Sequence, residues 1–201
     1  MSARVTTLRV TEQGVVLFAA HRARLGPAAE RSFDTFAATA RSGIYSLIAR
    51  DELLEVISRP ASRLFEGIGV RYAISPVADR RGPFPKEGSP SPYDAVRTPN
   101  LATLLTDPDA QEVWESCVAA VFAWDGAQLV AVPEARPRVD SLAERTVAAA
   151  LSPRRAPLLR EAGWPLVLVN AVITCVPAKQ VFPQAIRAAI DEAIHATIAR
   201  P

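Results

Sequence analysis

The sequence is short of the residue types that most catalytic and metal sites use. It has two histidines, two cysteines and one methionine among 201 residues. Two histidines and two cysteines at these spacings do not form a familiar zinc site. The Gly-x-Gly-x-x-Gly and Walker loops, the Gly-x-Ser-x-Gly elbow, the Cys-x-x-Cys pair and the His-Glu-x-x-His helix are also missing. We therefore expect no metal site and no cofactor.

Lysine is rare too, since Lys86 and Lys179 are the only two. Arginine carries most of the positive charge, and a bias toward Arg, Ala and Pro is typical of a GC-rich bacterial genome. The net charge of +2 is far from the concentrated basic surface of a nucleic-acid-binding protein. The start of the chain is polar, and no apolar run reaches the roughly 18 residues that a membrane span needs. We expect a soluble, cytoplasmic protein that makes no membrane contact.

What is present is the composition of a globular protein. Apolar residues make up 49% of the chain and charged residues 22%. A chain of this length buries about 70% of its unfolded surface in one large domain. Cys117 and Cys175 lie within apolar runs, so both are predicted to be buried free thiols rather than a disulfide. Residues 1–201 are predicted to form a single domain.

Four segments carry helical signals. Ile186, Ile190, Ile194 and Ile198 recur at four-residue steps, which predicts a core-facing helical stripe near the C-terminus. Ser141 and Glu144 have the spacing of a capping box, which marks a helix start. The predicted helices cover residues 28–41, 44–57, 141–151 and 183–199.

Four other segments read as strands. They are rich in β-branched residues and are bounded by glycine or proline. Asp125-Gly126 separates two apolar runs and predicts a tight type I′ hairpin. The predicted strands cover residues 68–74, 117–124, 127–132 and 165–176. These elements indicate an α+β fold with a mainly antiparallel sheet of about four to six strands and helices packed against it.

Residues 75–100 form the most unusual stretch because six prolines fall within it. Proline lacks the backbone donor and forbids a regular helix. Loops of this length in compact domains are functional or disordered. Two interpretations stay open, namely a disordered linker or arm, and an ordered loop that closes over a binding site.

Arginine and carboxylate groups cluster around this proline-rich loop. Guanidinium groups recognise carboxylate or phosphate through paired hydrogen bonds. A small anionic ligand could therefore bind here if the loop folds over a cleft. The candidate ligand-binding residues are Arg71, Arg80, Arg81, Tyr93, Asp94 and Arg97. No catalytic residue can be assigned, and His21 and His195 are both predicted to lie on the surface.

Charge is uneven along the chain, at +4 over residues 1–50, −5 over 101–150 and +3 over 151–201. Such asymmetry suits either uneven solvated faces or docking on a partner. Because recognised catalytic sets are missing, the leading hypothesis is a non-catalytic accessory or assembly subunit. It would bind a protein partner through the proline-rich arm and the sheet and helix surface.

Two alternatives remain. One is a small enzyme that acts on an anionic metabolite through the Arg, Asp and Tyr groups near residues 75–100. The other is a nucleic-acid-binding protein that uses N-terminal arginines, which the near-neutral total charge disfavours. Those arginines are Arg4, Arg9, Arg22, Arg24 and Arg31.

Overall fold

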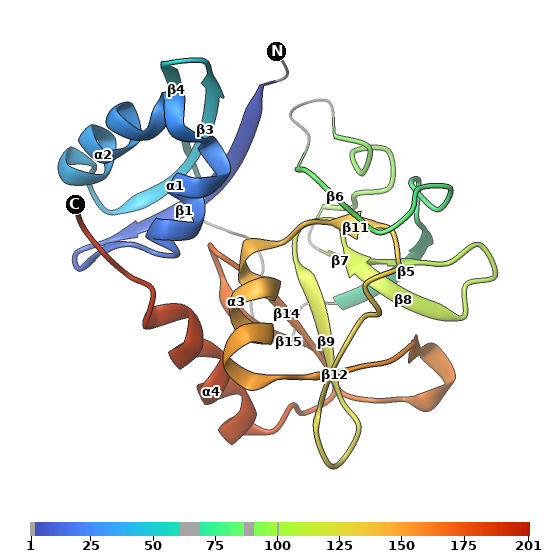
Figure 1. Cartoon of the computed structure of the whole chain (residues 1–201). Coiled ribbons are helices and arrows are strands. Elements are labelled where there is room, and N and C mark those ends of the chain that lie inside the picture. The colour runs from blue at the N-terminus through green and yellow to red at the C-terminus, as the bar shows by residue number, and fades with distance from the viewer. Residues whose placement is uncertain (1–2, 61–68, 87–90, 100) are drawn as a thin grey trace.

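The computed structural model describes residues 3–60, 69–86, 91–99 and 101–201. Two lobes are apparent in Figure 1, an N-terminal lobe of residues 3–59 and a C-terminal lobe of residues 69–195. Most strand pairs are antiparallel and helices pack on the sheets, so the predicted α+β class is confirmed. Within the described residues, no helix combines the length and the hydropathy that crossing a membrane would require.

The N-terminal lobe is a four-stranded antiparallel sheet in the order β2-β1-β3-β4, with two α-helices on one face. Its elements are β1 (Arg4–Thr11), β2 (Gly14–Val15), α1 (Phe18–Leu25), η1 (Pro27–Ala29), α2 (Glu30–Thr39), β3 (Gly43–Arg50) and β4 (Leu53–Arg59).

The two faces of this sheet differ because side chains alternate along each strand. Leu8 and Leu47 face the helices and form a buried cluster with Leu25 and Phe33. Thr7 is paired with Ser46 across β1 and β3 and faces the other way. One face is therefore hydrophobic core, and the other carries polar side chains together with apolar ones such as Ile44 and Ile48 and is turned toward the C-terminal lobe.

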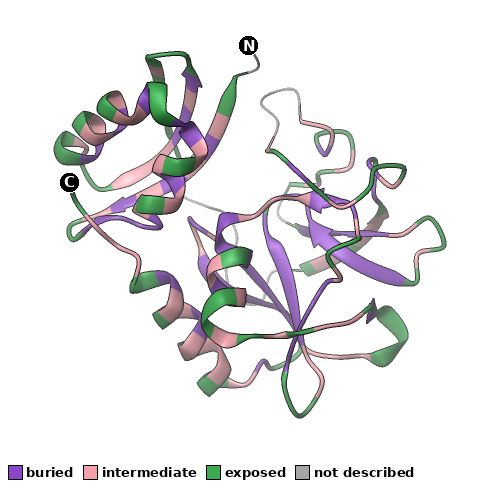
Figure 2. Cartoon of the chain, in the orientation of Figure 1, coloured by how far each residue is buried: buried purple, intermediate pink, exposed green. Residues whose placement is uncertain are grey.

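The C-terminal lobe contains two larger sheets, ordered β12-β10-β9-β14-β15 and β13-β8-β7-β5, and a small parallel pair of β11 with β6. Figure 2 shows that the central strands of this lobe are buried and that exposed residues gather on helices and loops. The elements are β5 (Gly69–Ile74), β6 (Pro83–Phe84), β7 (Leu101–Thr106), β8 (Glu112–Ser116), β9 (Ala120–Trp124), β10 (Leu129–Ala131), β11 (Arg138–Val139), α3 (Leu142–Leu151), β12 (Arg154–Arg155), β13 (Leu158–Leu159), η2 (Arg160–Ala162), β14 (Leu166–Asn170), β15 (Thr174–Lys179) and α4 (Gln184–His195).

Three predicted helices are found where the sequence indicated them, as α2, α3 and α4. Ser141 caps α3 by accepting a hydrogen bond from the Glu144 N–H at 3.2 Å. Ile190 and Ile194 of α4 are fully buried. Both predicted thiols, Cys117 and Cys175, are buried and free.

The predicted helix at residues 44–57 is wrong, because this segment is the β3–β4 hairpin. Its apolar residues were spaced like a helical face, but the turn at Asp51, which has a φ of 54°, reverses the chain. Isoleucine, tyrosine and valine in this segment favour strands, and pairing with β1 satisfies the backbone of β3 along its whole length.

The single strand predicted at 165–176 is also wrong, because the chain turns after Asn170 to form β14 and β15. The Asn170 side chain accepts hydrogen bonds from the N–H groups of Val172 and Ile173, which builds this turn. At the predicted type I′ turn, Gly126 alone has a positive φ and the loop runs from Asp125 to Gln128. The Asp125 carboxylate there accepts two backbone N–H groups.

The described parts of the proline-rich stretch pack onto the C-terminal lobe instead of extending away from it. Val77, Phe84 and Tyr93 are buried in one cluster with Leu105 and Cys117. These described parts therefore belong to the C-terminal lobe and do not reach out as an arm.

The C-terminal segment returns to the N-terminal lobe and links the two lobes. Val15 and Ala199 exchange backbone hydrogen bonds of 2.9 and 3.3 Å. The Leu17 N–H donates to the Thr197 hydroxyl at 3.1 Å. These contacts tie the N-terminal lobe to the segment that follows α4.

Candidate functional site

A cleft of about 870 Å³ lies where the two lobes meet. Cavities of roughly 300–1,000 Å³ hold small-molecule ligands in proteins. The N-terminal lobe contributes the face of β1, β3 and β4 that is turned away from its helices, together with His21 and Arg24 of α1. The C-terminal lobe contributes the proline-rich stretch, the end of β8, the start of α3 and the β14–β15 turn. The cleft thus draws on segments that are far apart in the sequence.

Positive charges outnumber negative ones among the charged side chains that line the cleft. Arg24, Arg59, Lys86 and Arg97 all line it. Among the described lining residues, the carboxylates are Asp94 and Glu115. The Asp94 carboxylate lies 3.7 Å from the Arg97 guanidinium and also accepts the Ser91 N–H. This excess of positive charge favours an anionic ligand.

Lys86 begins a row of polar contacts across the sheet face. Its Nζ donates to the Thr7 hydroxyl at 2.8 Å, and the Thr7 and Ser46 hydroxyls are 3.1 Å apart. The Arg59 Nε donates to the same Ser46 hydroxyl at 3.0 Å. Burial, together with the nearby charges of Arg24, Arg97 and Arg59, lowers the pKa of Lys86 to about 8.

His21 is buried in α1, so its predicted surface position is wrong. Its Nδ1 lies 2.6 Å from the Thr6 hydroxyl, while its Nε2 has no hydrogen-bond partner among the residues that the structure describes. Burial, together with the charges of Arg24 and Lys86, lowers the pKa of His21 to about 3. The ring is therefore neutral at physiological pH. His21 is one of the residues that line the cleft.

The start of α3 also lines the cleft, through Ser141, Leu142 and Ala143. Helix N-termini bind anions because their first N–H groups have no partner within the helix. Arg24 is held beside this helix start by the backbone carbonyl and carboxylate of Asp140. A guanidinium and a helix N-terminus are thus brought together at one edge of the site.

Glu115 and Tyr93 form a buried hydrogen-bonded pair on the C-terminal side of the cleft. The Tyr93 hydroxyl donates to the Glu115 carboxyl, and the Val139 N–H donates to both of its oxygens at 3.2 and 3.1 Å. Burial raises the pKa of Glu115 and outweighs these hydrogen bonds, which lower it, so that the pKa is about 8. Glu115 is thus protonated at neutral pH, which suits an acid or base that works there.

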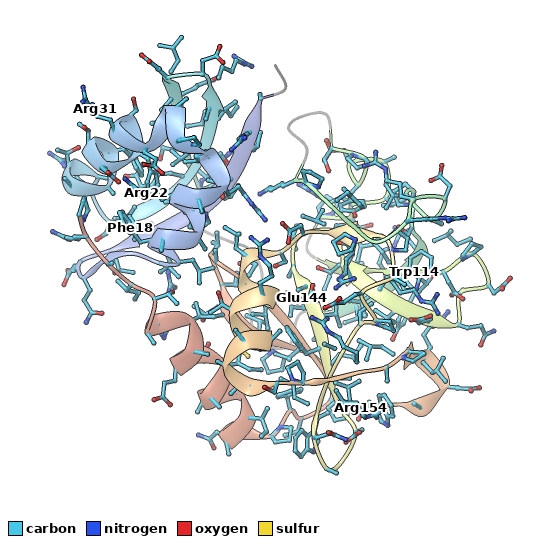
Figure 3. The ribbon with its side chains drawn as sticks, viewed as in Figure 1. Phe18, Arg22, Arg31, Trp114, Glu144 and Arg154 are labelled. Atoms are coloured by element: carbon cyan, nitrogen blue, oxygen red, sulfur yellow. The ribbon has the colours of Figure 1, made fainter. Side chains whose placement is uncertain are left out.

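A second buried glutamate lies behind this wall, on α3, where Figure 3 labels it. Glu144 accepts two hydrogen bonds from Arg138, at 3.0 and 2.8 Å, and one from Arg155 at 2.6 Å. Burial alone would raise the pKa of Glu144, but the two guanidinium groups outweigh it and lower the pKa. Glu144 does not line the cleft, so its network holds the C-terminal lobe together around the site.

The structure divides the six candidate residues from the sequence into two groups. Tyr93, Asp94 and Arg97 line the cleft. The others lie outside its lining: Arg71 donates to the Thr98 hydroxyl at 2.6 Å, Arg80 stacks 4.5 Å from the centre of the Phe84 ring, and Arg81 is exposed.

Sequence reasoning missed His21, Lys86 and Glu115. The rarity of lysine was a usable signal, because a single lysine within the proline-rich stretch stood out. His21 and Glu115 gave no such signal, since their burial depends on contacts with Thr6 and Tyr93 that are distant in sequence. Across the described ranges, no cluster of three or more histidine, cysteine or acidic side chains is arranged to hold a metal ion.

Comparison with known proteins finds similarity in structure alone. No protein-family profile matches the sequence, and no curated protein matches it. An aminotransferase from Brucella abortus, bound to the cofactor PLP (pyridoxal 5′-phosphate), is similar with a TM-score of 0.69 at 14% identity. The match covers 96% of this chain and 89% of that one.

Two further solved structures are similar over a comparable span. The 4-amino-4-deoxychorismate lyase of Pseudomonas aeruginosa gives a TM-score of 0.64 at 16% identity, over 95% of this chain and 89% of that one. A hypothetical aminotransferase of Mycobacterium tuberculosis in its PLP-bound form gives 0.62 at 18% identity, over 98% and 89%.

These likenesses correct the leading prediction of a non-catalytic accessory subunit. The similar structures are described as enzymes, and they match nearly the whole chain. The described parts of the predicted partner-binding arm pack against the C-terminal lobe, where Phe84 and Tyr93 are buried. At these identities the comparison establishes the fold alone, and the fold is that of aminotransferases and 4-amino-4-deoxychorismate lyases.

Proposed function

We propose that the protein is an enzyme that acts on an anionic small molecule bound in the cleft between the lobes. The observation that carries this proposal is the lining of the cleft, where Arg24, Arg59 and Lys86 converge from separate elements. The carboxyl group of Glu115 is neutral at physiological pH and does not cancel their charge. The likeness to enzyme folds supports the same conclusion.

PLP is a chemically suitable occupant because it is a phosphorylated aldehyde. The guanidinium groups and the α3 N-terminus fit its phosphate, and the primary amine of Lys86 fits its aldehyde. When bound, PLP supplies an electron sink that stabilises a carbanion. In that arrangement Arg24 and Arg59 would hold the anionic group. Glu115, which is protonated and held by Tyr93, would keep a proton within the cleft.

Binding of inorganic phosphate and of PLP, measured by isothermal titration calorimetry, tests this proposal. We expect Arg59→Gln to weaken both affinities by about tenfold or more, since a hydrogen bond to a charged group contributes about 1.5–3 kcal/mol. Higher salt concentration should weaken binding as well.

Arg50→Gln is the matched control. Arg50 ends the neighbouring strand β3, is exposed, lies 3.8 Å from the Glu55 carboxylate and does not line the cleft. Its substitution should leave both affinities unchanged. Equal losses in the two variants, or no binding of either anion by the unaltered protein, would refute the proposal.

A further inference from the structure

We propose that Thr197 is a positioning residue for the anion site, because it fixes the start of α1 and thereby the place of Arg24 in the cleft. The inference rests on the proposed function and goes beyond it, since it assigns a role in binding to a residue that does not line the cleft. Thr197 belongs to a C-terminal strap, residues 196–200, which runs from the end of α4 to the N-terminal lobe (Figure 1).

The helix that the strap meets, α1, is short and lies between the lobes. Its eight residues are fewer than the roughly 12–15 that an isolated helix needs to be stable in water. Ala20 packs against the main core cluster of the C-terminal lobe, whereas Phe18 and Leu25 pack in the cluster of the N-terminal lobe. His21 and Arg24 of the same helix line the cleft. The orientation of these two side chains therefore depends on what anchors α1.

The start of α1 has an unfavourable backbone conformation. Leu17, the residue before the helix, has a φ of 57° and a ψ of 38°, which lie in the left-handed region. A residue with a Cβ stays in that region only where its surroundings hold it there. The Leu17 side chain is buried in the core cluster of the C-terminal lobe, and its carbonyl accepts the His21 N–H at 3.0 Å. A relaxation of Leu17 would thus turn α1 and move Arg24, which lies two turns further on.

Thr197 holds Leu17 in this conformation. Its hydroxyl accepts the Leu17 N–H at 3.1 Å and donates to the Ile194 carbonyl at 2.5 Å, so it connects the start of α1 to the last turn of α4. Without this hydroxyl the Leu17 N–H would lose its acceptor, which favours a rearrangement of the backbone. The strap is itself paired with the N-terminal lobe through Val15 and Ala199. The same segment therefore joins the lobes and sets the direction of α1.

The other end of α1 is anchored at the anion site. Arg24 donates to the backbone carbonyl and the carboxylate of Asp140, beside the start of α3. A shift of α1 at Leu17 would either break this contact or move the guanidinium away from the α3 N-terminus. Both outcomes weaken a site in which the two groups have to face the same anion.

Binding of inorganic phosphate by the full chain, measured by isothermal titration calorimetry, tests the proposal. Thr197→Val keeps the shape of the side chain and removes the acceptor of the Leu17 N–H. We expect its dissociation constant to rise about five- to tenfold, and that of Thr197→Ser, which keeps the hydroxyl, to stay within about twofold. Thr35→Val is the matched control. Thr35 is an exposed residue of α2 that donates to the Arg31 carbonyl, so its substitution should leave the affinity unchanged.

A double-mutant cycle shows whether Thr197 acts through Arg24. In a protein that already carries Arg24→Gln, Thr197→Val should have no further effect on phosphate affinity, because the cation that Thr197 positions is gone. In a protein that carries Arg59→Gln the full loss should remain, because Arg59 lies on β4 and not on α1. An equal effect of Thr197→Val in both backgrounds would overturn the proposal.

A second variant displaces the strap without changing Thr197. A methyl group added at Gly14 would lie 2.4 Å from the Ala199 carbonyl oxygen, so Gly14→Ala pushes the strap away. Gly14 has a φ of 138°, which strains an alanine, and Gly126→Ala controls for that strain because Gly126 has a φ of 99° and open space around it. Gly14→Ala should weaken phosphate binding as Thr197→Val does, and Gly126→Ala should not. Equal affinities of the two glycine variants would contradict the role of the strap.

Hydrogen exchange separates this inference from the proposed function. The His21 N–H, which is bonded to Leu17, should exchange about fivefold faster or more in Thr197→Val than in Thr35→Val, with no ligand present. Unchanged phosphate affinity in Thr197→Val would refute the inference at any exchange rate and leave the cationic cleft standing. If the unaltered protein binds no phosphate, the proposed function fails, and the role of Thr197 in anion binding fails with it. Circular dichroism identifies variants that do not fold, and if Thr197→Val is one of them, Gly14→Ala provides the same test.

Discussion

Two buried glutamates of the C-terminal lobe sit in opposite electrostatic environments. Glu115 is 4% exposed and Glu144 is 6% exposed, so burial alone does not distinguish them. Glu144 is hydrogen-bonded by two guanidinium groups, whereas Glu115 is hydrogen-bonded by a phenol and a backbone N–H. The pKa of Glu144 is consequently lowered and that of Glu115 is raised to about 8.

The difference follows the boundary of the cleft. Glu144 lies behind the cleft wall, where a buried charge must be neutralised for the fold to be stable. Glu115 lines the cleft, and no guanidinium group is hydrogen-bonded to its carboxyl group among the described contacts. Perturbed carboxyl groups in clefts are typical of functional sites. The comparison therefore separates a structural network from a candidate chemical group.

The largest expected effect comes from breaking the Glu144 network. Glu144→Gln keeps the size of the side chain but leaves Arg138 buried without a countercharge, which costs about 3–5 kcal/mol of unfolding free energy. Chemical denaturation measures this loss. Arg145→Gln on the same helix removes an exposed ion pair with Asp140 and should cost at most about 1 kcal/mol. Similar costs for the two variants would contradict the structural role of Glu144.

The lowered pKa of Glu144 also predicts that the protein loses stability in acid. Its pKa is lower in the folded state than the usual 4.5, so its contribution is present above pH 4.5 and disappears as the pH falls below that value. Glu144→Gln should show a shallower decline of unfolding free energy in this acid range.

Glu115→Gln should show the opposite dependence on pH. Because the folded pKa of Glu115 is raised from 4.5 to about 8, the unaltered protein loses stability as the pH rises between these values. Gln cannot ionise, so the variant should be more stable above pH 8 by about 4–5 kcal/mol. Denaturation midpoints from pH 4 to pH 9 measure the difference. A midpoint that falls equally in both proteins over this range would contradict the raised pKa.

The smallest effect is expected at Ser141, which caps the helix that carries Glu144. Ser141→Ala removes the hydrogen bond from the Glu144 N–H and should cost about 1 kcal/mol. Thr146→Ala, in the middle of α3, removes a hydroxyl that bonds the Leu142 carbonyl and serves as a control. If both changes were neutral, the cap would not contribute to the position of Glu144.

Local patterns in the sequence were sufficient for several elements. The isoleucine stripe of α4 needs only a helical period, and the Ser141 cap needs only a hydroxyl three residues before an N–H. Such features depend on neighbours within one or two turns. The same reasoning failed at residues 44–57. The apolar spacing there fitted a helix, but hydrogen bonding to β1 stabilises the segment as strands.

The site was only partly accessible from sequence. Tyr93, Asp94 and Arg97 were selected because the proline-rich stretch concentrates polar groups, and they do line the cleft. Lys86 lies in the same stretch but was passed over, because its contact with Thr7 spans 79 positions of the chain. The neutrality of His21 and the protonation of Glu115 arise from burial, which no local pattern encodes.

The sequence by itself determined the α+β class, the helices α2, α3 and α4, and the buried free thiols, because these follow from periodicity, capping and hydropathy over short distances. Only the tertiary structure decided that the proline-rich stretch packs inward and that two lobes enclose a cationic cleft. The physical reason is that electrostatic environment depends on distance in space. Residues from α1, β4 and the proline-rich stretch acquire their chemistry only when folding brings them together.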